Sequence, residues 1–363
     1  MLFTRLAAPA LLLGLCVLAP AASHAAEPST PAAVFRETGR IVTDDGVNEQ
    51  RLLKIGGIDQ WVSVRGRHRT SPILLILHGG PGFTLSPLDF AYMRTWEEYF
   101  TVVQWDQRGA GKTRAANDPA VVTPPLTVKR MVDDAEELTA WLRSTYGKDR
   151  IAVMGHSFGT ILGVELVQRR PEWFSAYVGM GQFVAFERNE ALGYQQTLAA
   201  ARAAGNVQAV AELESIAPFP DPRRPERNYE GLRIERRWLA EYDGYYWRRG
   251  TGTSDAVAAF SPNDTAADLA ARRAGEGDSA RQMWPELAMV DFTARNRFQA
   301  PVVFLQGRHD RGTSSTILAE WYETIQAPSK TLVWFEESAH MPFEEEPGKT
   351  LVSLVEKVLP LTR

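Results

Sequence analysis

Short runs of apolar residues recur along the chain and are separated by longer stretches with a helical pattern. Continuous apolar runs of this kind are typical of strands buried on both faces of a sheet. The candidate strands are Gln60–Val64, Ile73–Leu77, Phe100–Trp105, Ile151–Met154, Tyr177–Met180, Pro301–Leu305 and Thr331–Phe335. The candidate helices are Thr127–Tyr146, Thr160–Arg169, Ser314–Ile325 and Lys349–Val358. The alternation predicts an α/β fold with a mostly parallel central sheet and helices on both faces.

This alternation is interrupted between residues 185 and 297. The stretch is rich in Ala, Arg, Glu and aromatic residues, and it contains helical segments such as Glu190–Ala204 and Arg233–Tyr242. It has no apolar run typical of a buried strand. Several prolines and the sequence Gly275-Glu276-Gly277 are typical of loops. We interpret residues 185–297 as a helical cap inserted between two parts of one core, residues 27–184 and 298–363.

The N-terminal residues 1–26 have the pattern of a secretory signal peptide. Arg5 is followed by a short apolar run and then by small residues up to Ala26. We therefore expect cleavage after Ala25 or Ala26 and export to the periplasm or the exterior. The apolar run is shorter than a membrane span requires, so no stable span is expected after cleavage. Residues 27–34 are expected to form a flexible polar leader.

Composition excludes some classes of function. The chain has 363 residues, of which 44% are hydrophobic and 23% charged, as in ordinary folded proteins. Its 40 basic and 44 acidic residues give a net charge of −4 without a basic block, so nucleic acid is not an expected partner. The single cysteine, Cys16, excludes a disulfide framework and a cysteine-based zinc site. The oligomeric state stays open.

A candidate nucleophile lies in the sequence Gly155-His156-Ser157-Phe158-Gly159, directly between a candidate strand and a candidate helix. A Gly-x-Ser-x-Gly motif at a sharp strand-to-helix turn exposes the serine oxygen above the sheet. The glycines keep side chains out of the cramped turn. The motif alone is a modest signal, but its position after a buried strand favours Ser157 as the nucleophile.

A second glycine-rich sequence, His78-Gly79-Gly80-Pro81-Gly82, follows the strand Ile73–Leu77. Backbone N–H groups of such a loop can stabilise the oxyanion that forms when a serine attacks a carbonyl group. The candidate donors are the N–H groups of Gly80 and Phe158, because Pro81 has none. We expect His78 to brace this loop rather than to act as a base.

A serine nucleophile needs a general base that a carboxylate orients. In this type of fold the acid and then the histidine follow the serine, after later strands. His340 follows Thr331–Phe335 and is the candidate base, and Asp310 follows Pro301–Leu305 and is the candidate acid. His309 is adjacent to Asp310, so those two side chains cannot readily form the pair.

Five motifs in order carry a family resemblance: HGGPG, DQRGAGKT at residues 106–113, GHSFG, GRHD at residues 307–310, and the loop with His340. Together they resemble the proline iminopeptidase (prolyl aminopeptidase) family of α/β-hydrolases. The resemblance covers the two core parts and implies an α/β-hydrolase fold with a cap. It implies a serine peptidase that releases N-terminal proline or another small residue from short peptides. The acyl-enzyme chemistry of Ser157, Asp310 and His340 needs no metal or organic cofactor.

The substrate-binding residues are expected in the cap. Aromatic side chains there are candidates for lining an apolar pocket over Ser157: Trp238, Tyr242, Tyr245, Tyr246, Trp247 and Trp284. The resemblance also implies that cap carboxylates bind the free amino terminus of a substrate. The carboxylate candidates are Glu187, Glu190, Glu235 and Glu241.

Other interpretations stay open. An esterase or lactonase would use the same triad, and the elbow GHSFG differs from the Gly-Gly-Ser-Trp-Gly common in proline iminopeptidases. A non-catalytic ligand-binding protein of the same fold is a more remote alternative. In DQRGAGKT, Asp106 and Arg108 are expected to form a structural ion pair, with each other or with the oxyanion loop, because the spacing does not match a phosphate-binding loop.

Overall fold

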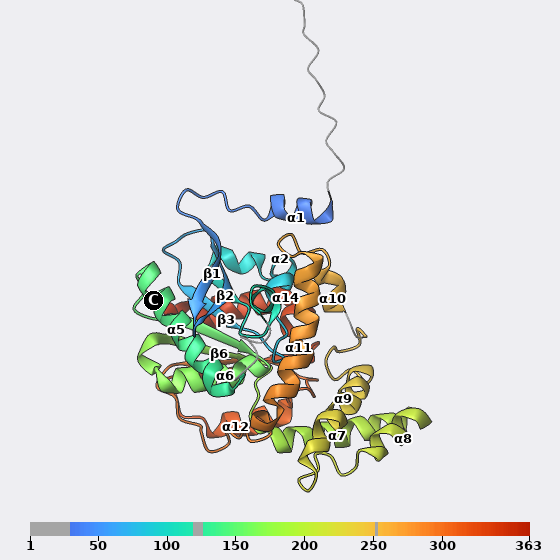
Figure 1. The fold of residues 1–363 in the computed structure, drawn as a ribbon. Helices are drawn as coiled ribbons and strands as arrows, with labels where there is room; N and C mark the ends of the chain where they lie inside the picture. Colours follow the sequence, from blue (N-terminus) through green and yellow to red (C-terminus); the bar gives the residue numbers. More distant parts are fainter. Residues whose placement is uncertain (1–29, 119–125, 251–252) are drawn as a thin grey trace, which may run out of the picture.

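The central element of the computed structural model is an eight-stranded sheet (Figure 1). The described residues are 30–118, 126–250 and 253–363, and the signal peptide predicted at residues 1–26 lies outside them. The strands are β1 (Val47–Ile55), β2 (Ile58–Gly66), β3 (Ile73–Leu77), β4 (Thr101–Trp105), β5 (Ile151–His156), β6 (Phe174–Met180), β7 (Val302–Gly307) and β8 (Lys330–Phe335). Their order in the sheet is β1-β2-β4-β3-β5-β6-β7-β8. The β1–β2 and β2–β4 pairs are antiparallel and the other pairs are parallel, which confirms the predicted mostly parallel sheet.

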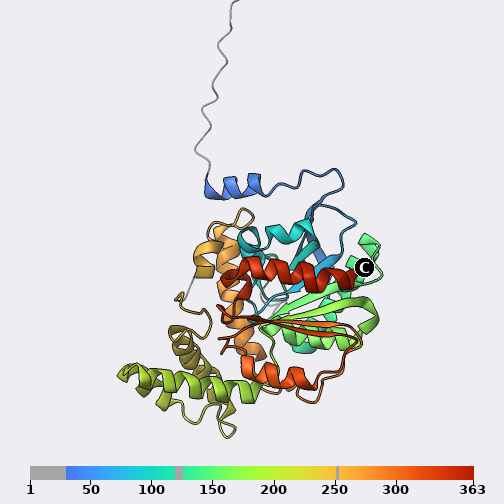
Figure 2. The same ribbon diagram turned by 180° about the vertical axis from the view of Figure 1, so that it is seen from behind.

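Helices cover both faces of this sheet (Figures 1 and 2). One face packs against α5 (Val128–Tyr146), α6 (Phe158–Arg169) and α12 (Ser315–Thr324). The other face packs against the segment 85–100 and the C-terminal helical stretch that starts with α14 (Pro347–Ser353). Within the described ranges, no helix is both long enough and apolar enough to cross a membrane.

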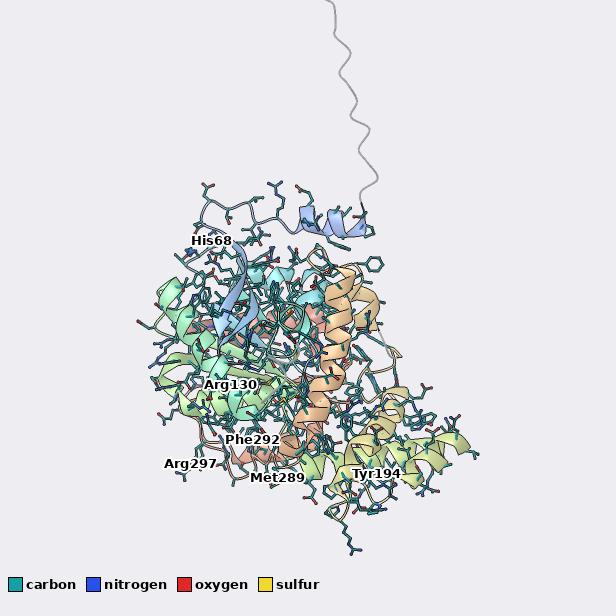
Figure 3. All side chains as sticks on the ribbon, viewed as in Figure 1. His68, Arg130, Tyr194, Met289, Phe292 and Arg297 are labelled. Carbon is teal, nitrogen blue, oxygen red and sulfur yellow. The ribbon has the colours of Figure 1, made fainter. Side chains whose placement is uncertain are left out.

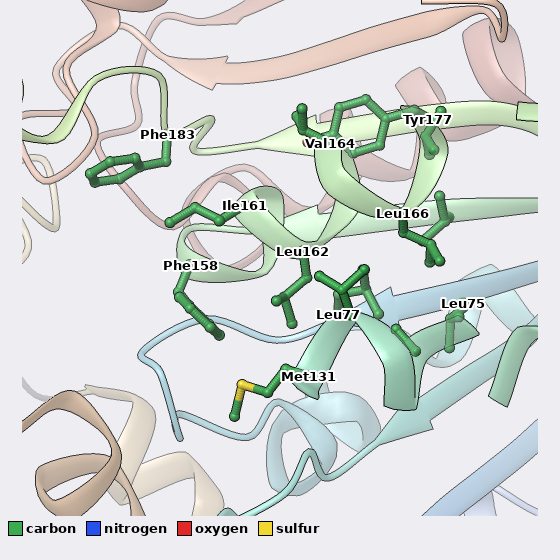
Figure 4. Close-up of a cluster of buried hydrophobic side chains, with 14 of the residues drawn as sticks. Leu75, Leu77, Met131, Phe158, Ile161, Leu162, Val164, Leu166, Tyr177 and Phe183 are labelled. Carbon is green, nitrogen blue, oxygen red and sulfur yellow. The ribbon is translucent and has the colours of Figure 1, made fainter. Parts of the chain in front are cut away.

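Strand β3 shows why its sequence is apolar at every position. Leu75 and Leu77 belong to the cluster with α5 and α6, whereas Leu74 and Ile76 belong to the cluster on the opposite face, and all four are fully buried. Figure 4 shows the first cluster, in which the side chains of β3 gather with those of α6 and with Met131 of α5. A strand covered on both faces has no polar side.

Between β6 and β7 the described chain is helical, within the stretch predicted as a cap. The helices are α7 (Phe186–Ala203), α8 (Val207–Ser215), α9 (Pro225–Glu241), α10 (Thr253–Ala258) and α11 (Ala266–Leu287). The N–H of Phe292 donates to the carbonyl oxygen of Val184 at 2.8 Å, so the beginning and the end of this stretch lie side by side. Tyr194 of α7 packs against Phe219 in a separate apolar cluster, away from the sheet (Figure 3).

Helix α11 corrects one prediction, because it runs through Gly275-Glu276-Gly277, which we expected to be a loop. Close backbone packing explains why residue 275 is a glycine. A Cβ atom on Gly275 would lie 2.5 Å from the carbonyl oxygen of Gly109, and one on Gly82 would lie 2.7 Å from the carbonyl oxygen of Gly275. The helix therefore approaches two loops of the core so closely that no side chain fits between them.

The N-terminal region also differs from the prediction. The expected flexible leader, residues 27–34, overlaps α1 (Pro31–Thr38), so the prediction is wrong from Pro31 onward. The side chain of Thr30 accepts a hydrogen bond from the N–H of Ala33 at 3.2 Å, and Pro31 occupies the first helical position. Both features favour a helix start.

Candidate active site

Ser157 lies in the turn between β5 and α6. Its backbone has φ 54° and ψ −123°, a conformation that residues with side chains rarely adopt and that is found at functional sites. A Cβ atom on Gly155 would overlap the backbone of Gly159, and one on Gly159 would overlap the backbone of Leu77. Both glycines of the motif are therefore required for the turn to close. The N–H of Ser157 donates to the carbonyl oxygen of Met180 at 3.0 Å, which fixes the turn against β6.

His340 and Asp310 meet beyond the carboxyl ends of β8 and β7. The Nδ1 atom of His340 lies 2.9 Å from Oδ2 of Asp310. Asp310 is 2% exposed and also accepts hydrogen bonds from the N–H of Thr313 at 2.8 Å and from Nε2 of Gln306 at 3.0 Å. These donors fix the carboxylate, and the carboxylate fixes the imidazole ring. Ser157 and His340 line the same two cavities, so the structure brings the three sequence-predicted residues to one site.

A buried carboxylate holds the backbone on both sides of His340. Glu345, at the end of α13 (Pro342–Glu345), is 3% exposed. Its Oε2 atom accepts the N–H of Ala339 at 2.9 Å and that of Met341 at 3.2 Å. Its Oε1 atom accepts the N–H of Trp247, which belongs to the cap, at 2.6 Å. Glu345 therefore joins the loop of His340 to the cap.

Two further groups fix the backbone of His340 itself. Its N–H donates to the carbonyl oxygen of Tyr245 in the cap at 3.0 Å. Its carbonyl oxygen lies 3.0 Å from Nε2 of His156, the residue before the serine. Burial lowers the pKa of His156 to about 3, so the ring is neutral and its hydrogen must be on Nε2 to donate to a carbonyl oxygen. This role of His156 was not predicted from the sequence.

The glycine-rich loop after β3 lies against Ser157. A Cβ atom on Gly79 would lie 2.9 Å from Cβ of Ser157, and Gly80 has φ 107°, in the region that favours glycine. His78 accepts the N–H of Gln107 at Nε2 (3.1 Å), so its Nδ1–H donates to the carbonyl oxygen of Gly79 (2.9 Å). Burial lowers the pKa of His78 to about 4, in keeping with this neutral ring. His78 thus braces the loop.

The DQRGAGKT motif corrects another expectation. Asp106 and Arg108 do not pair with each other. The Nε atom of Arg108 donates to Oδ2 of Asp134 in α5 at 2.8 Å. Asp106 instead accepts hydrogen bonds from Oγ of Ser86 at 2.7 Å and from the N–H of Lys112 at 2.8 Å. Arg108 therefore holds the motif to α5, whereas Asp106 holds the segment of Ser86 to the motif.

Two cavities meet at Ser157, and His340, Arg236 and Tyr245 line both of them. The smaller has a volume of about 150 Å³ and includes Gly80 and Phe158 in its wall. Its remaining wall is mostly apolar: Ile161, Phe183, Phe186, Leu232, Trp284 and Leu287. Figure 4 shows Phe158, Ile161 and Phe183 at this end of the core. The larger cavity has a volume of about 460 Å³, and its wall includes Phe83, Tyr246 and Ser254 together with two acidic side chains, Asp255 and Glu276.

Glu190 is a fully buried carboxylate in the wall of the smaller cavity. Its Oε1 atom accepts hydrogen bonds from Nη2 of Arg236 at 2.5 Å and from Nδ2 of Asn189 at 3.1 Å. Its Oε2 atom is buried without a hydrogen-bond partner among the described residues. Arg236 also pairs with Glu235, so one guanidinium group faces two buried carboxylates. A buried anionic oxygen without a donor is unfavourable unless a ligand supplies one.

The structure separates the substrate-binding candidates. Glu190 lines the smaller cavity and Tyr246 lines the larger one. Glu187 and Glu241 are exposed, and neither they nor Trp238 lines these cavities. Glu187 and Trp238 are therefore wrong as residues of the cavity wall, because Glu187 is exposed on α7 and Trp238 packs against α8, where its Nε1 atom donates to Glu212 at 3.0 Å. Of the other aromatic candidates, the structure brings Tyr245 and Trp284 to a cavity wall, but neither Tyr242 nor Trp247.

Sequence reasoning missed three charged residues of the cavity walls, Arg236, Asp255 and Glu276. A helical spacing could have found two of them. The residues of α9 that line the cavities are Leu232, Arg236 and Ala240. Those of α11 are Glu276, Ala280, Trp284 and Leu287. Positions three or four residues apart lie on one face of a helix, so each set is one stripe.

The site holds the groups that acyl transfer requires: a hydroxyl group, an imidazole ring fixed by a carboxylate, and backbone N–H groups around one cavity. Within residues 30–118, 126–250 and 253–363, no group of three or more His, Cys, Asp and Glu side chains is placed to hold a metal ion.

Comparisons with known proteins agree with the fold and with the family resemblance. The family model described as alpha/beta hydrolase fold matches residues 72–347. The chain is 28% identical over 300 residues to "Probable aminopeptidase YbaC" of Bacillus subtilis (strain 168), over 82% of this chain and 92% of that protein. It is 24% identical over 289 residues to a proline iminopeptidase of Heyndrickxia coagulans, over 77% and 87% of the two chains. The resemblance predicted from the motifs is thus confirmed.

A solved structure shows the same fold. The proline iminopeptidase-related protein TTHA1809 of Thermus thermophilus superposes with a TM-score of 0.59 at 23% identity. The superposition covers 87% of this chain and 99% of that one.

Proposed function

Because the chain belongs to the alpha/beta hydrolase fold family, we propose that it is a serine hydrolase in which Ser157 is the nucleophile and His340 the general base. Nε2 of His340 takes the proton of Ser157 as Oγ bonds to the carbonyl carbon of the substrate. The N–H groups of Gly80 and Phe158 bind the oxyanion of the tetrahedral intermediate. The bond to the leaving amine then breaks, and the amine takes the proton from His340.

Deacylation uses the same groups in reverse. Water gives a proton to His340 as its oxygen bonds to the acyl carbon, and the intermediate collapses to a free acid with Ser157 protonated again. The 2.9 Å hydrogen bond between Nδ1 of His340 and Asp310 supports these roles, because it keeps the hydrogen on Nδ1 and leaves Nε2 free to accept a proton.

The substrate is a short peptide with a free N-terminal proline or another small residue. The observation that carries this proposal is the unpartnered Oε2 atom of Glu190 in a small apolar cavity beside Ser157. The ammonium group of an N-terminal residue would donate to that oxygen, and a small apolar side chain would fit the cavity wall. The names of the aminopeptidase and proline iminopeptidase relatives support the same substrate class.

The test compares proline naphthylamide with its N-acetylated form. A charge-assisted hydrogen bond contributes about 1.5–3 kcal/mol, so we expect the free amine to have a kcat/KM roughly 10- to 150-fold higher. Glu190→Gln should remove most of this preference. Glu187→Gln is the matched control, because it removes the same charge from an exposed position of the same helix. Equal rates on the free and blocked amides, or activity on p-nitrophenyl esters alone, would instead indicate an esterase or lactonase.

A further inference from the structure

The two cavities differ in how exposed their acidic residues are, and this difference indicates the direction in which a peptide binds. Glu190, in the wall of the smaller cavity, is 0% exposed, whereas the side chain of Asp255, in the wall of the larger one, is 53% exposed. The closed end of the site is therefore at Glu190, and the open end is at Asp255. On the proposed function, on which this inference rests, the N-terminal residue fills the smaller cavity. The residue after the scissile bond then lies in the larger cavity.

Glu276 stands in the wall of this larger cavity without a partner of its own. It lies on α11, one turn before Ala280, which lines the smaller cavity. The packing of Gly275 against Gly109 and Gly82 fixes this part of the helix over the active site. Among the described residues, no hydrogen bond or ion pair engages the Glu276 carboxylate. Its charge is therefore available to a substrate.

Arg272 acts on Glu276 electrostatically but forms its ion pair with a different carboxylate. It is 2% exposed, forms an ion pair with Asp255, and donates to the carbonyl oxygen of Thr84 at 3.2 Å. Its guanidinium carbon lies 4.1 Å from the ring centre of Phe83. Phe83 lines the cavity and Arg272 does not, so the ring separates this cation from a bound peptide.

Acidic groups outnumber basic groups around the two cavities. The carboxylates in the two walls are Glu190, Asp255 and Glu276, and the guanidinium group in the walls is that of Arg236; Glu235 and Arg272 lie behind the walls as ion-pair partners. Arg236 is paired with Glu190 and Glu235, and Arg272 is paired with Asp255. We propose that Glu276 makes the enzyme prefer peptides whose second residue carries a positive charge, lysine or arginine.

The size of the preference follows from the surroundings of Glu276. A fully exposed ion pair changes affinity little, whereas a charge-assisted hydrogen bond away from water contributes more. Glu276 is half-buried at the edge of a cavity. We therefore expect a kcat/KM about tenfold higher for a lysyl than for an uncharged second residue of equal length.

The experiment uses three dipeptide amides that begin with proline and differ in the second residue: lysine, norleucine or glutamate. Wild type should cleave the lysyl peptide about tenfold better than the norleucyl peptide, and the glutamyl peptide worst. In Glu276→Gln the lysyl-to-norleucyl ratio should fall to about one, and in Glu276→Lys the glutamyl peptide should become the better substrate. Glu241→Gln, which removes the same charge from an exposed position of the cap, should keep the wild-type ratio. A wild-type ratio near one, or an unchanged ratio in Glu276→Gln, overturns the inference.

A binding measurement separates this inference from the proposed function. If none of the three peptides is cleaved, the aminopeptidase proposal fails, but the larger cavity can still be tested. Calorimetry then compares lysinamide with norleucinamide on wild type and on Glu276→Gln. Tighter binding of lysinamide that is lost in the variant supports the role of Glu276. Lysinamide that binds wild type no better than norleucinamide overturns it.

Discussion

Replacing Glu345 by Gln tests how the loop of His340 is held. The carboxylate accepts two N–H groups at Oε2, from Ala339 and Met341, and one at Oε1, from Trp247. A glutamine amide has one oxygen that accepts and an NH2 group that only donates. Whichever way the amide is turned, its NH2 group faces at least one of these N–H groups. At least one buried donor therefore loses its partner.

The expected effects follow from this count. If the amide oxygen keeps Ala339 and Met341, only the N–H of Trp247 is unpaired, and the free energy of unfolding falls by about 1–3 kcal/mol. The opposite orientation leaves two donors unpaired, so it is disfavoured. His340 lies between the two donors on its own loop, and a displacement of about 1 Å in a catalytic group costs about 100-fold in rate. We expect kcat to fall by roughly 10- to 100-fold. KM should change little, since Glu345 lines neither cavity.

The assay measures denaturant unfolding and steady-state kinetics on the same preparations. Glu346→Gln is the control, because Glu346 also accepts hydrogen bonds, from the N–H of Glu337 at 3.0 Å and Oγ of Ser338 at 2.8 Å, but is only half-buried. Both donors bind the same oxygen, Oε2, so the amide oxygen of glutamine can keep them, and both quantities should change less. Wild-type kcat in Glu345→Gln, at reduced stability, would refute the link between this carboxylate and the position of His340.

Three other predictions concern the reaction, the pH dependence of stability and export. Ser157→Ala, Asp310→Asn and His340→Ala should each fold and lose activity by roughly 10³-fold or more, with little further loss in double variants. A fluorophosphonate should label wild type and not Ser157→Ala. Near-normal turnover in His340→Ala would contradict the role of His340 as the base. Burial raises the pKa of Glu344 from its ordinary 4.5 to about 7. The native protein then keeps a proton that the unfolded chain releases, so the free energy of unfolding of wild type should fall relative to that of Glu344→Gln as pH rises from 4.5 to 7. A difference between the two proteins that stays constant across this pH range would contradict the prediction. Mass spectrometry of the exported protein should find Ala26 or Glu27 at the N-terminus, whereas an intact Met1 would exclude the predicted signal peptide.

The strands show where a sequence pattern is sufficient to predict structure. The parallel strands β3 to β7 are buried along their whole length, and the edge strand β8 is half-buried; each contains a continuous apolar run that predicts a strand. Strand β1 was missed, because it lies at the edge of the sheet and exposes polar residues such as Asn48 and Arg51. Its pairing with β2 depends on the hydrogen-bonding edge that β2 offers, and this is not written in the sequence of β1.

The candidate catalytic residues were found because each belongs to a short local unit. Ser157 follows a strand and opens a helix, and the glycines around it are required by that turn alone. Asp310 and His340 each lie a few residues beyond a parallel strand, and parallel strands bring their carboxyl ends to one edge of the sheet. In these cases about five residues of sequence, together with the order of the strands, are enough to place the side chain.

The cavity walls depend on a different kind of information. Glu276 and Arg236 lie on separate helices, and although each belongs to a stripe at helical spacing, that spacing alone does not show that the stripe lines a cavity. The decisive contact is the approach of α11 to the core at Gly275. Gly275 on the helix and Gly82 in the core both lack the side chain that would hold the helix away. A glycine costs a helix about 1 kcal/mol relative to alanine, so by propensity alone Gly275-Glu276-Gly277 indicates a loop. Packing reverses that preference, and by doing so it places Glu276 in the wall of the cavity that Ser157 also lines. The candidate catalytic groups are thus placed by local turns, whereas the proposed substrate preference depends on how closely α11 can approach the core.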